Sequence, residues 1–137
     1  MSEKVIRNWL NELSRTVAAH DHAAHMQLIS RDVSLLGAPG YDSIGYDDWS
    51  KQCQHEFANR LIRRVDYGKL QIRVVTDRRL KFMTYESVTD KDGNINAQGI
   101  ECLLHKGDDG RWRLIQERIL KPEETRLYDL EPGTTVS

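Results

Sequence analysis

The sequence predicts an α+β domain in which a curved antiparallel sheet forms a cone closed by three helices. Two observations lead to this prediction. The first half of the chain repeats apolar residues at helical spacing in three separate segments, and the second half alternates apolar and polar residues in consecutive runs joined by short turns. Strands connected by short turns pair antiparallel, and helices that precede them pack on one side of the sheet.

Three helices are expected in the first half. Between Glu3 and about Ala19, apolar residues recur every three or four positions, which gives a long first helix one buried face. Asp21 is suited to cap a short second helix that runs to about Ile29, because its carboxylate can accept from free amide groups of the first turn. The rest of this half is expected to form a strand over 33–36, a Gly-Pro loop over 37–40 and a third helix over 46–61.

Four strands are expected in the second half. Alternation begins after Gly68 and covers 70–75, and a second run covers 80–88. The glycine-containing segments 90–94 and 106–110 are hairpin turns, because glycine accepts positive φ. Pro122 suits the first turn of a short final helix. We expect one domain over 1–137, with 121–137 as a C-terminal extension.

Composition narrows the possible partners. The chain has 137 residues with 20 basic and 21 acidic side chains, and this balance argues against nucleic acid, which requires a clustered basic excess. No run is long and apolar enough to span a membrane, and no signal peptide is visible, so no membrane partner and a cytoplasmic location are expected. No cofactor motif is present, and no cofactor is expected.

Three short segments carry a resemblance to a known superfamily. The segments Ala18-Ala19-His20-Asp21, Leu28-Ile29-Ser30-Arg31-Asp32-Val33 and Gly110-Arg111-Trp112-Arg113-Leu114-Ile115 resemble the pattern of the nuclear transport factor 2-like superfamily, which includes SnoaL-like and ketosteroid isomerase-like proteins. The resemblance covers roughly residues 5–120. It implies a cone around a pocket and, commonly, a homodimer through the outer sheet face. Functions of the superfamily range from isomerases, cyclases and dehydratases to non-enzymatic binding modules, so the fold does not decide the function.

The ketosteroid isomerase type gives a residue-level comparison. Such enzymes use a tyrosine on the first helix, a carboxylate base after the first strand and a protonated acid on the third long strand. The matching positions here are Leu13, Gly37 and Glu101. Only the third position therefore has a side chain of the required kind, an acid. The resemblance therefore argues against that particular isomerase chemistry.

Period-two alternation sorts the strand residues onto two faces. The more apolar face needs a cover, which is either the helices or a second subunit. The resemblance implies that the more polar face lines the pocket, and on this assignment the more apolar face forms a homodimer interface. The expected pocket face consists of Phe82, Thr84, Glu86, Gly99, Glu101, Leu103, Ile115, Glu117 and Ile119. The expected interface consists of Met83, Tyr85, Ile100, Cys102, Leu104, Trp112 and Leu114.

Glu101 and Glu117 are the candidate catalytic residues. If they lie close together on adjacent strands, burial and like charge raise their pKa values toward those of a general acid and base. Two alternatives stay open: arginines such as Arg118 neutralise them in solvent, or a bulge turns one of them outward. The candidate ligand-binding residues are Trp9, Leu13, Tyr41, Trp49, Phe57, Phe82, Glu86 and Ile115.

His20, His22 and His25 form a cluster that could suggest zinc. No Cys, Asp or Glu at suitable spacing completes a site, so no metal is expected. Two functions remain. The first is a homodimeric protein that binds a small, mostly apolar ligand in its cone and acts on it by acid–base chemistry of the isomerase, cyclase or dehydratase kind. The alternative is a non-catalytic homodimeric association or binding module.

Overall fold

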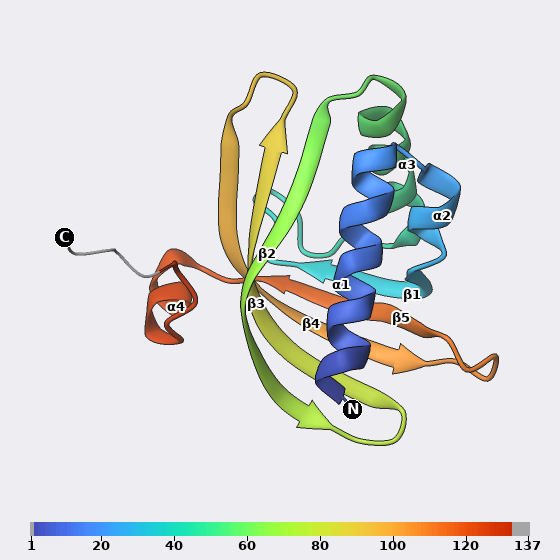
Figure 1. Cartoon of the computed structure of the whole chain (residues 1–137), viewed down its shortest axis with the longest axis vertical. Coiled ribbons are helices and arrows are strands. Elements are labelled where there is room, and N and C mark those ends of the chain that lie inside the picture. The colour runs from blue at the N-terminus through green and yellow to red at the C-terminus, as the bar shows by residue number, and fades with distance from the viewer. Residues whose placement is uncertain (1, 133–137) are drawn as a thin grey trace.

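The computed structural model describes residues 2–132, which form four helices and one five-stranded sheet (Figure 1). The elements in chain order are α1 (Ser2–Ala19), α2 (His22–Met26), β1 (Ile29–Leu36), α3 (Tyr46–Ala58), β2 (Ile62–Val75), β3 (Arg79–Asp90), β4 (Ile95–Lys106), β5 (Trp112–Ile119) and α4 (Pro122–Leu127). The predicted α+β class and the curved sheet with three helices on one side are confirmed. Residues 133–137 of the expected C-terminal extension lie outside the described residues.

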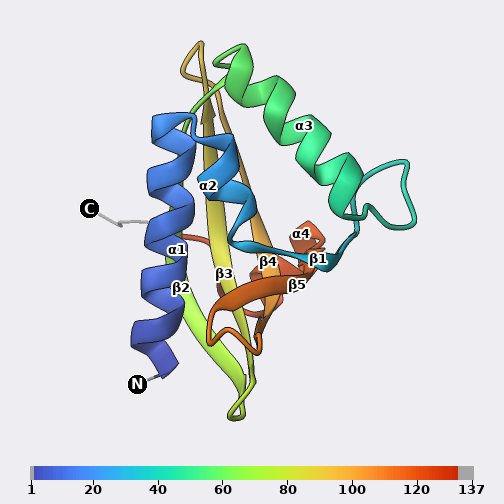
Figure 2. The ribbon, with the colours of Figure 1, turned by 90° about the vertical axis from the view of Figure 1, so that its right-hand side faces the viewer.

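The sheet has the strand order β1-β5-β4-β3-β2. β1 pairs with β5 in parallel, and the other neighbours pair antiparallel. Figure 2 shows α1, α2 and α3 on one side of the curved sheet, with α3 inclined away from it at one end.

The core lies between α1 and the sheet, as the apolar spacing of the first segment predicts. Trp9 and Phe82 belong to this core, with 4% and 0% of their surfaces exposed, and their rings meet edge to face at 6.3 Å. The Trp9 indole Nε1 donates to the Leu28 carbonyl at 3.2 Å, so this hydrogen bond and the contact with Phe82 together fix the position of the indole ring.

Several predicted boundaries are wrong, and one of them is the end of α3, which lies at Ala58 instead of 61. α2 ends at Met26 instead of Ile29, because Ile29 already pairs with Leu114 of β5 and begins a strand of eight residues. β2 begins at Ile62 instead of 70, and its register with β3 shifts between Tyr67 and Leu70. Such an irregularity interrupts period two and hides the first half of the strand from sequence analysis.

The predicted sorting of residues onto two faces is also wrong for β4. Four residues, 91–94, connect β3 to β4, and Phe82 therefore pairs with Cys102, not with Glu101. A one-residue change of register moves every side chain of a strand to the other face. On β5, a bulge at Ile115 lets both Leu114 and Glu117 share the face of Cys102.

The predicted homodimer interface is therefore not a single surface. Ile100, Cys102, Leu104 and Leu114 are at most 1% exposed and belong to the core beneath the helices. Met83 does face outward, but Leu120 and Leu130, which flank α4, cover it. Homodimerisation itself stays a prediction. Among residues 2–132, no helix is long and apolar enough to cross a membrane.

Candidate functional site

An inner cavity of about 220 Å³ lies between the helices and the sheet. Its walls come from α1, α2, α3 and four of the strands, so it needs the complete fold. The lining residues are Leu13, Val17, His25, Ile29, Trp49, Cys53, Glu56, Phe57, Ile62, Val65, Tyr67, Glu86, Val88, Leu114 and Glu117.

An outer groove of about 630 Å³ adjoins this cavity along α3. The two spaces have Trp49, Cys53 and Glu56 in common. Tyr41, from the irregular loop before α3, lines the groove and is 66% exposed. The groove and the cavity are therefore neighbours along α3, and this loop lies at the rim of the groove.

Five residues named by the sequence analysis line the inner cavity: Leu13, Trp49, Phe57, Glu86 and Glu117. Tyr41 lines the groove. The other four line neither space: Trp9 and Phe82 lie in the core, Ile115 forms the bulge of β5, and Glu101 lies on the opposite face of the sheet.

Two carboxylates, Glu86 on β3 and Glu117 on β5, enter the cavity from neighbouring parts of the same sheet face. Burial raises the pKa of both, and the charge of Glu86 raises the pKa of Glu117 further. Each keeps some accessible surface, and the cavity that both line gives a ligand access to it. The two groups titrate as a pair.

Each glutamate has a neighbour on the adjoining strand. The Tyr67 hydroxyl on β2 donates to Glu86 Oε2 at 3.1 Å, and the Cys102 Sγ on β4 lies 3.9 Å from Glu117 Oε1. Burial raises the pKa of the Tyr67 phenol and that of the Cys102 thiol, so both neighbours stay protonated and donate. The hydrogen bond from Tyr67 opposes part of the rise in the pKa of Glu86.

His25 on α2 provides a third polar group in the cavity wall. It is 7% exposed, its ring packs edge to face on Phe57 at 5.2 Å, and burial lowers its pKa to about 4. The Thr16 hydroxyl donates to the Leu13 carbonyl at 3.0 Å and therefore accepts from His25 Nδ1 at 2.9 Å. His25 is thus the neutral tautomer with its proton on Nδ1, and Nε2 carries a free lone pair.

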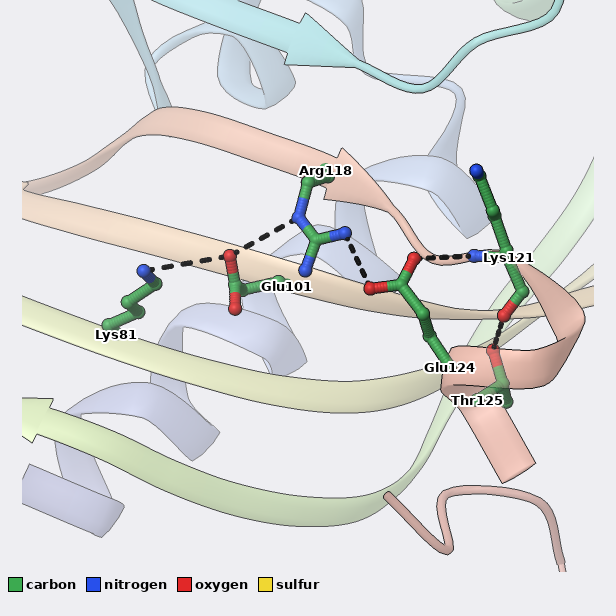
Figure 3. Close-up of polar contacts among 6 residues, drawn as sticks. All are labelled: Lys81, Glu101, Arg118, Lys121, Glu124 and Thr125. Atoms are coloured by element: carbon green, nitrogen blue, oxygen red, sulfur yellow. Dashed lines mark hydrogen bonds and ion pairs between the residues drawn. The ribbon is translucent and has the colours of Figure 1, made fainter. Parts of the chain in front are cut away.

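Glu101 lies outside the cone and is held by two cations (Figure 3). Its Oε1 is 3.6 Å from Lys81 Nζ and 3.6 Å from Arg118 Nε, while Arg118 Nη1 reaches Glu124 Oε2 at 2.8 Å. The prediction that Glu101 shares a face with Glu117 is wrong. The alternative of an arginine-paired glutamate holds for Glu101, and the network joins α4 to the sheet.

The three histidines near α2 surround the Phe57 ring. His20 and His22 meet it at 6.3 Å and 6.4 Å, and His22 Nε2 also lies 3.0 Å from the Ser50 carbonyl. Within residues 2–132, no group of three or more His, Cys, Asp or Glu side chains is placed to hold a metal ion.

Sequence analysis missed Tyr67 and His25 as site residues. Val65 and Tyr67 are two positions apart and both line the cavity, so an earlier start of β2 is the signal that could have found Tyr67. The histidine cluster suggests His25 only as a metal ligand. The apolar spacing around it, with Met26 next to it in the core, indicates a buried imidazole.

Comparison with solved structures identifies the fold. A nuclear transport factor 2-like protein of unknown function from Shewanella oneidensis matches with a TM-score of 0.74 at 15% identity, over 87% of this chain and 98% of that one. A candidate scytalone dehydratase from Novosphingobium aromaticivorans matches with 0.69 at 14%, over 85% and 81%. A protein from Catenulispora acidiphila, in complex with S-DNPA, matches with 0.68 at 16%, over 93% and 96%.

The sequence itself matches no protein-family model and no curated protein. The likeness therefore concerns backbone architecture, and it covers most of both chains in each comparison. This chain has the fold of the nuclear transport factor 2-like superfamily.

Proposed function

We propose that this protein binds a small, mostly apolar molecule in the inner cavity and acts on it by acid–base chemistry. The observation that carries the proposal is the pair Glu86 and Glu117, two carboxyl groups of raised pKa that line one cavity. General acid–base catalysis requires groups whose pKa values lie near the working pH. Perturbed acids in a cavity are typical of catalytic sites.

The reaction class that fits is dehydration or isomerisation beside a carbonyl group. The ionised member of the pair takes a proton from the carbon next to the carbonyl, and the protonated member gives its proton to a leaving hydroxyl group. The C–O bond breaks, water leaves, and a C=C bond forms. The pair ends with its single proton on the other carboxylate, and proton exchange restores the starting state.

The walls support a compact substrate. The cavity is smaller than the 300–1,000 Å³ that is usual for sites of drug-sized ligands. Val65, Leu114 and Phe57 are apolar, and the candidate dehydratase with the same fold supports the reaction class. The homodimer and the cytoplasmic location expected from the sequence are further proposals that this function does not require.

Solvent deuterium incorporation tests the proposed function without a known substrate. A panel of small cyclic ketones and β-hydroxyketones is incubated with the protein in D₂O, and NMR follows exchange at the carbon next to the carbonyl and loss of water. We expect Glu117→Gln and Glu86→Gln to abolish catalysed exchange. Glu101→Gln, a glutamate on the opposite face, is the matched control and should retain it. Equal exchange by all four proteins would remove the acid–base assignment.

A further inference from the structure

The charges that line the inner cavity are not balanced by cations. Glu56, Glu86 and Glu117 line it, whereas none of its described lining residues is Lys or Arg. Among residues 2–132, neither Glu86 nor Glu117 takes part in an ion pair, although Glu101 on the opposite face has two cationic partners. A buried carboxylate needs a compensating partner, because desolvation of an unpaired charge is costly.

The remaining polar groups add acceptors rather than donors. His25 is 93% buried, since 7% of its surface is exposed, and its Nε2 is left with a free lone pair once Nδ1 donates to Thr16. The Tyr67 hydroxyl is already used on Glu86, which also accepts from the Gln98 side chain. A ligand that fits these groups must therefore bring its own N–H donors.

The walls between these acceptors are aromatic and apolar. Trp49, Phe57 and Tyr67 all line the cavity, and aromatic faces attract organic cations. Leu13, Val17 and Val65 complete walls that favour an apolar body.

We propose that the ligand of this cavity is a small organic cation, a protonated amine carried on a compact apolar body, whose ammonium group takes the place of the missing counter-ion of Glu86 and Glu117. The inference rests on the proposed function, because it names the substrate class of the same cavity. A neutral or anionic ligand of equal shape leaves the carboxylates uncompensated and binds less tightly.

The titratable groups around Glu86 and Glu117 determine whether protons move when a ligand binds. β2 contributes Tyr67, β4 contributes Cys102, α2 contributes His25, and α3 contributes Cys53 and Glu56, whereas α1 contributes apolar side chains. None of these groups supplies a positive charge at neutral pH, because burial keeps His25 neutral. Arrival of an ammonium group therefore compensates the ionised member of the glutamate pair, while the other member keeps the single proton that the proposed function requires.

Three probes of one shape test the proposal. 2-Phenylethylamine, 2-phenylethanol and 3-phenylpropanoate share a phenyl ring and a two-carbon arm, and they end in a cation, a neutral group and an anion. Isothermal titration calorimetry with the full chain near pH 7.5 is run in two buffers of different ionisation enthalpy. We expect the amine to bind at least about tenfold more tightly than the alcohol, and the two buffers should give the same binding enthalpy because the pair keeps its single proton.

Two cavity variants and one outer-face variant then locate the effect. In Glu117→Gln and in Glu86→Gln, the preference for the amine should fall to about threefold or less, while the alcohol keeps its affinity. Glu101→Gln should keep the wild-type preference. Use of both cavity variants keeps the test valid if one of them fails to fold.

The outcomes separate this inference from the proposed function. Equal binding of amine and alcohol by the wild type, or binding of none of the three probes, overturns the substrate class. If deuterium incorporation still depends on Glu117 in that case, the acid–base function stands alone. If the amine preference holds while exchange is unchanged in both cavity variants, the ligand class stands and the catalytic proposal is lost.

Discussion

Substitution of His25 by glutamine should remove an acid-sensitive part of the stability. The pKa of His25 is lowered by burial from 6.5 to about 4 in the folded protein. As pH falls below about 6.5, the unfolded chain takes up a proton that the folded protein refuses, so the free energy of unfolding decreases until the pH reaches the folded-state pKa. Stability from this group is therefore present above about pH 6.5 and lost by about pH 4.

The size of the effect follows from the same pKa. Each unit of difference between the folded and unfolded pKa corresponds to about 1.4 kcal/mol, so His25 accounts for about 3 kcal/mol over the whole window. Its side chain is 7% exposed, which leaves little room for solvent screening. Glutamine keeps a hydrogen-bonding group near Thr16 and cannot titrate.

Urea unfolding followed by tryptophan fluorescence, at several pH values between about 4.5 and about 7, measures the effect. The difference in unfolding free energy between wild type and His25→Gln should shrink by about 2–3 kcal/mol as the pH falls across this range. His105→Gln, on β4 away from the cavity, controls for the loss of a histidine. A difference that stays constant with pH would refute the buried, neutral His25.

Three further predictions concern the two faces of the sheet. Burial raises the pKa of Glu117, so wild-type stability should fall as pH rises from about 4.3 through the folded-state pKa, and urea unfolding of Glu117→Gln should show a flatter curve over the same range. Glu101→Gln should cost about 1 kcal/mol or less in thermal unfolding, because its partners Lys81 and Arg118 are partly exposed and Arg118 keeps Glu124. Gly99→Ala should cost about 1–3 kcal/mol in urea unfolding, because the added Cβ would lie 2.6 Å from Thr125 Oγ1 and 3.1 Å from Leu130 Cδ1; a stability within error of wild type would show that α4 is not packed firmly there.

Local chemistry allowed the elements to be predicted from the sequence. Asp21 caps α2 by accepting from the Ala24 amide at 3.1 Å, and Gly93 and Gly110 adopt the positive φ that the two hairpin turns require. These features depend on a few neighbouring residues. The parallel pairing of β1 with β5 depends on contacts across the whole chain, and no local pattern indicates it.

The faces of the strands could not be predicted in the same way. The side on which Glu101 lies is set by the loop over 91–94, and the side of Glu117 relative to Leu114 is set by the bulge at Ile115. One residue more or less at either place moves a whole strand by one register position. Alternation along the sequence does not show where an extra residue lies in a turn or a bulge. The sequence therefore predicts glutamates as the candidate residues, but it pairs Glu117 with Glu101 instead of Glu86.

The contrast between Glu101 and Glu117 shows what distinguishes the candidate site. Both are glutamates on neighbouring strands, and Glu101 is itself only 16% exposed at its side chain. The fold surrounds Glu101 with Lys81 and Arg118, whereas it gives Glu117 a thiol and a second carboxylate. A side chain that served stability alone would gain from a cation, because an uncompensated buried charge is destabilising. The missing cation, more than the residue type, is therefore the observation that supports the proposed role of Glu86 and Glu117 in binding a ligand.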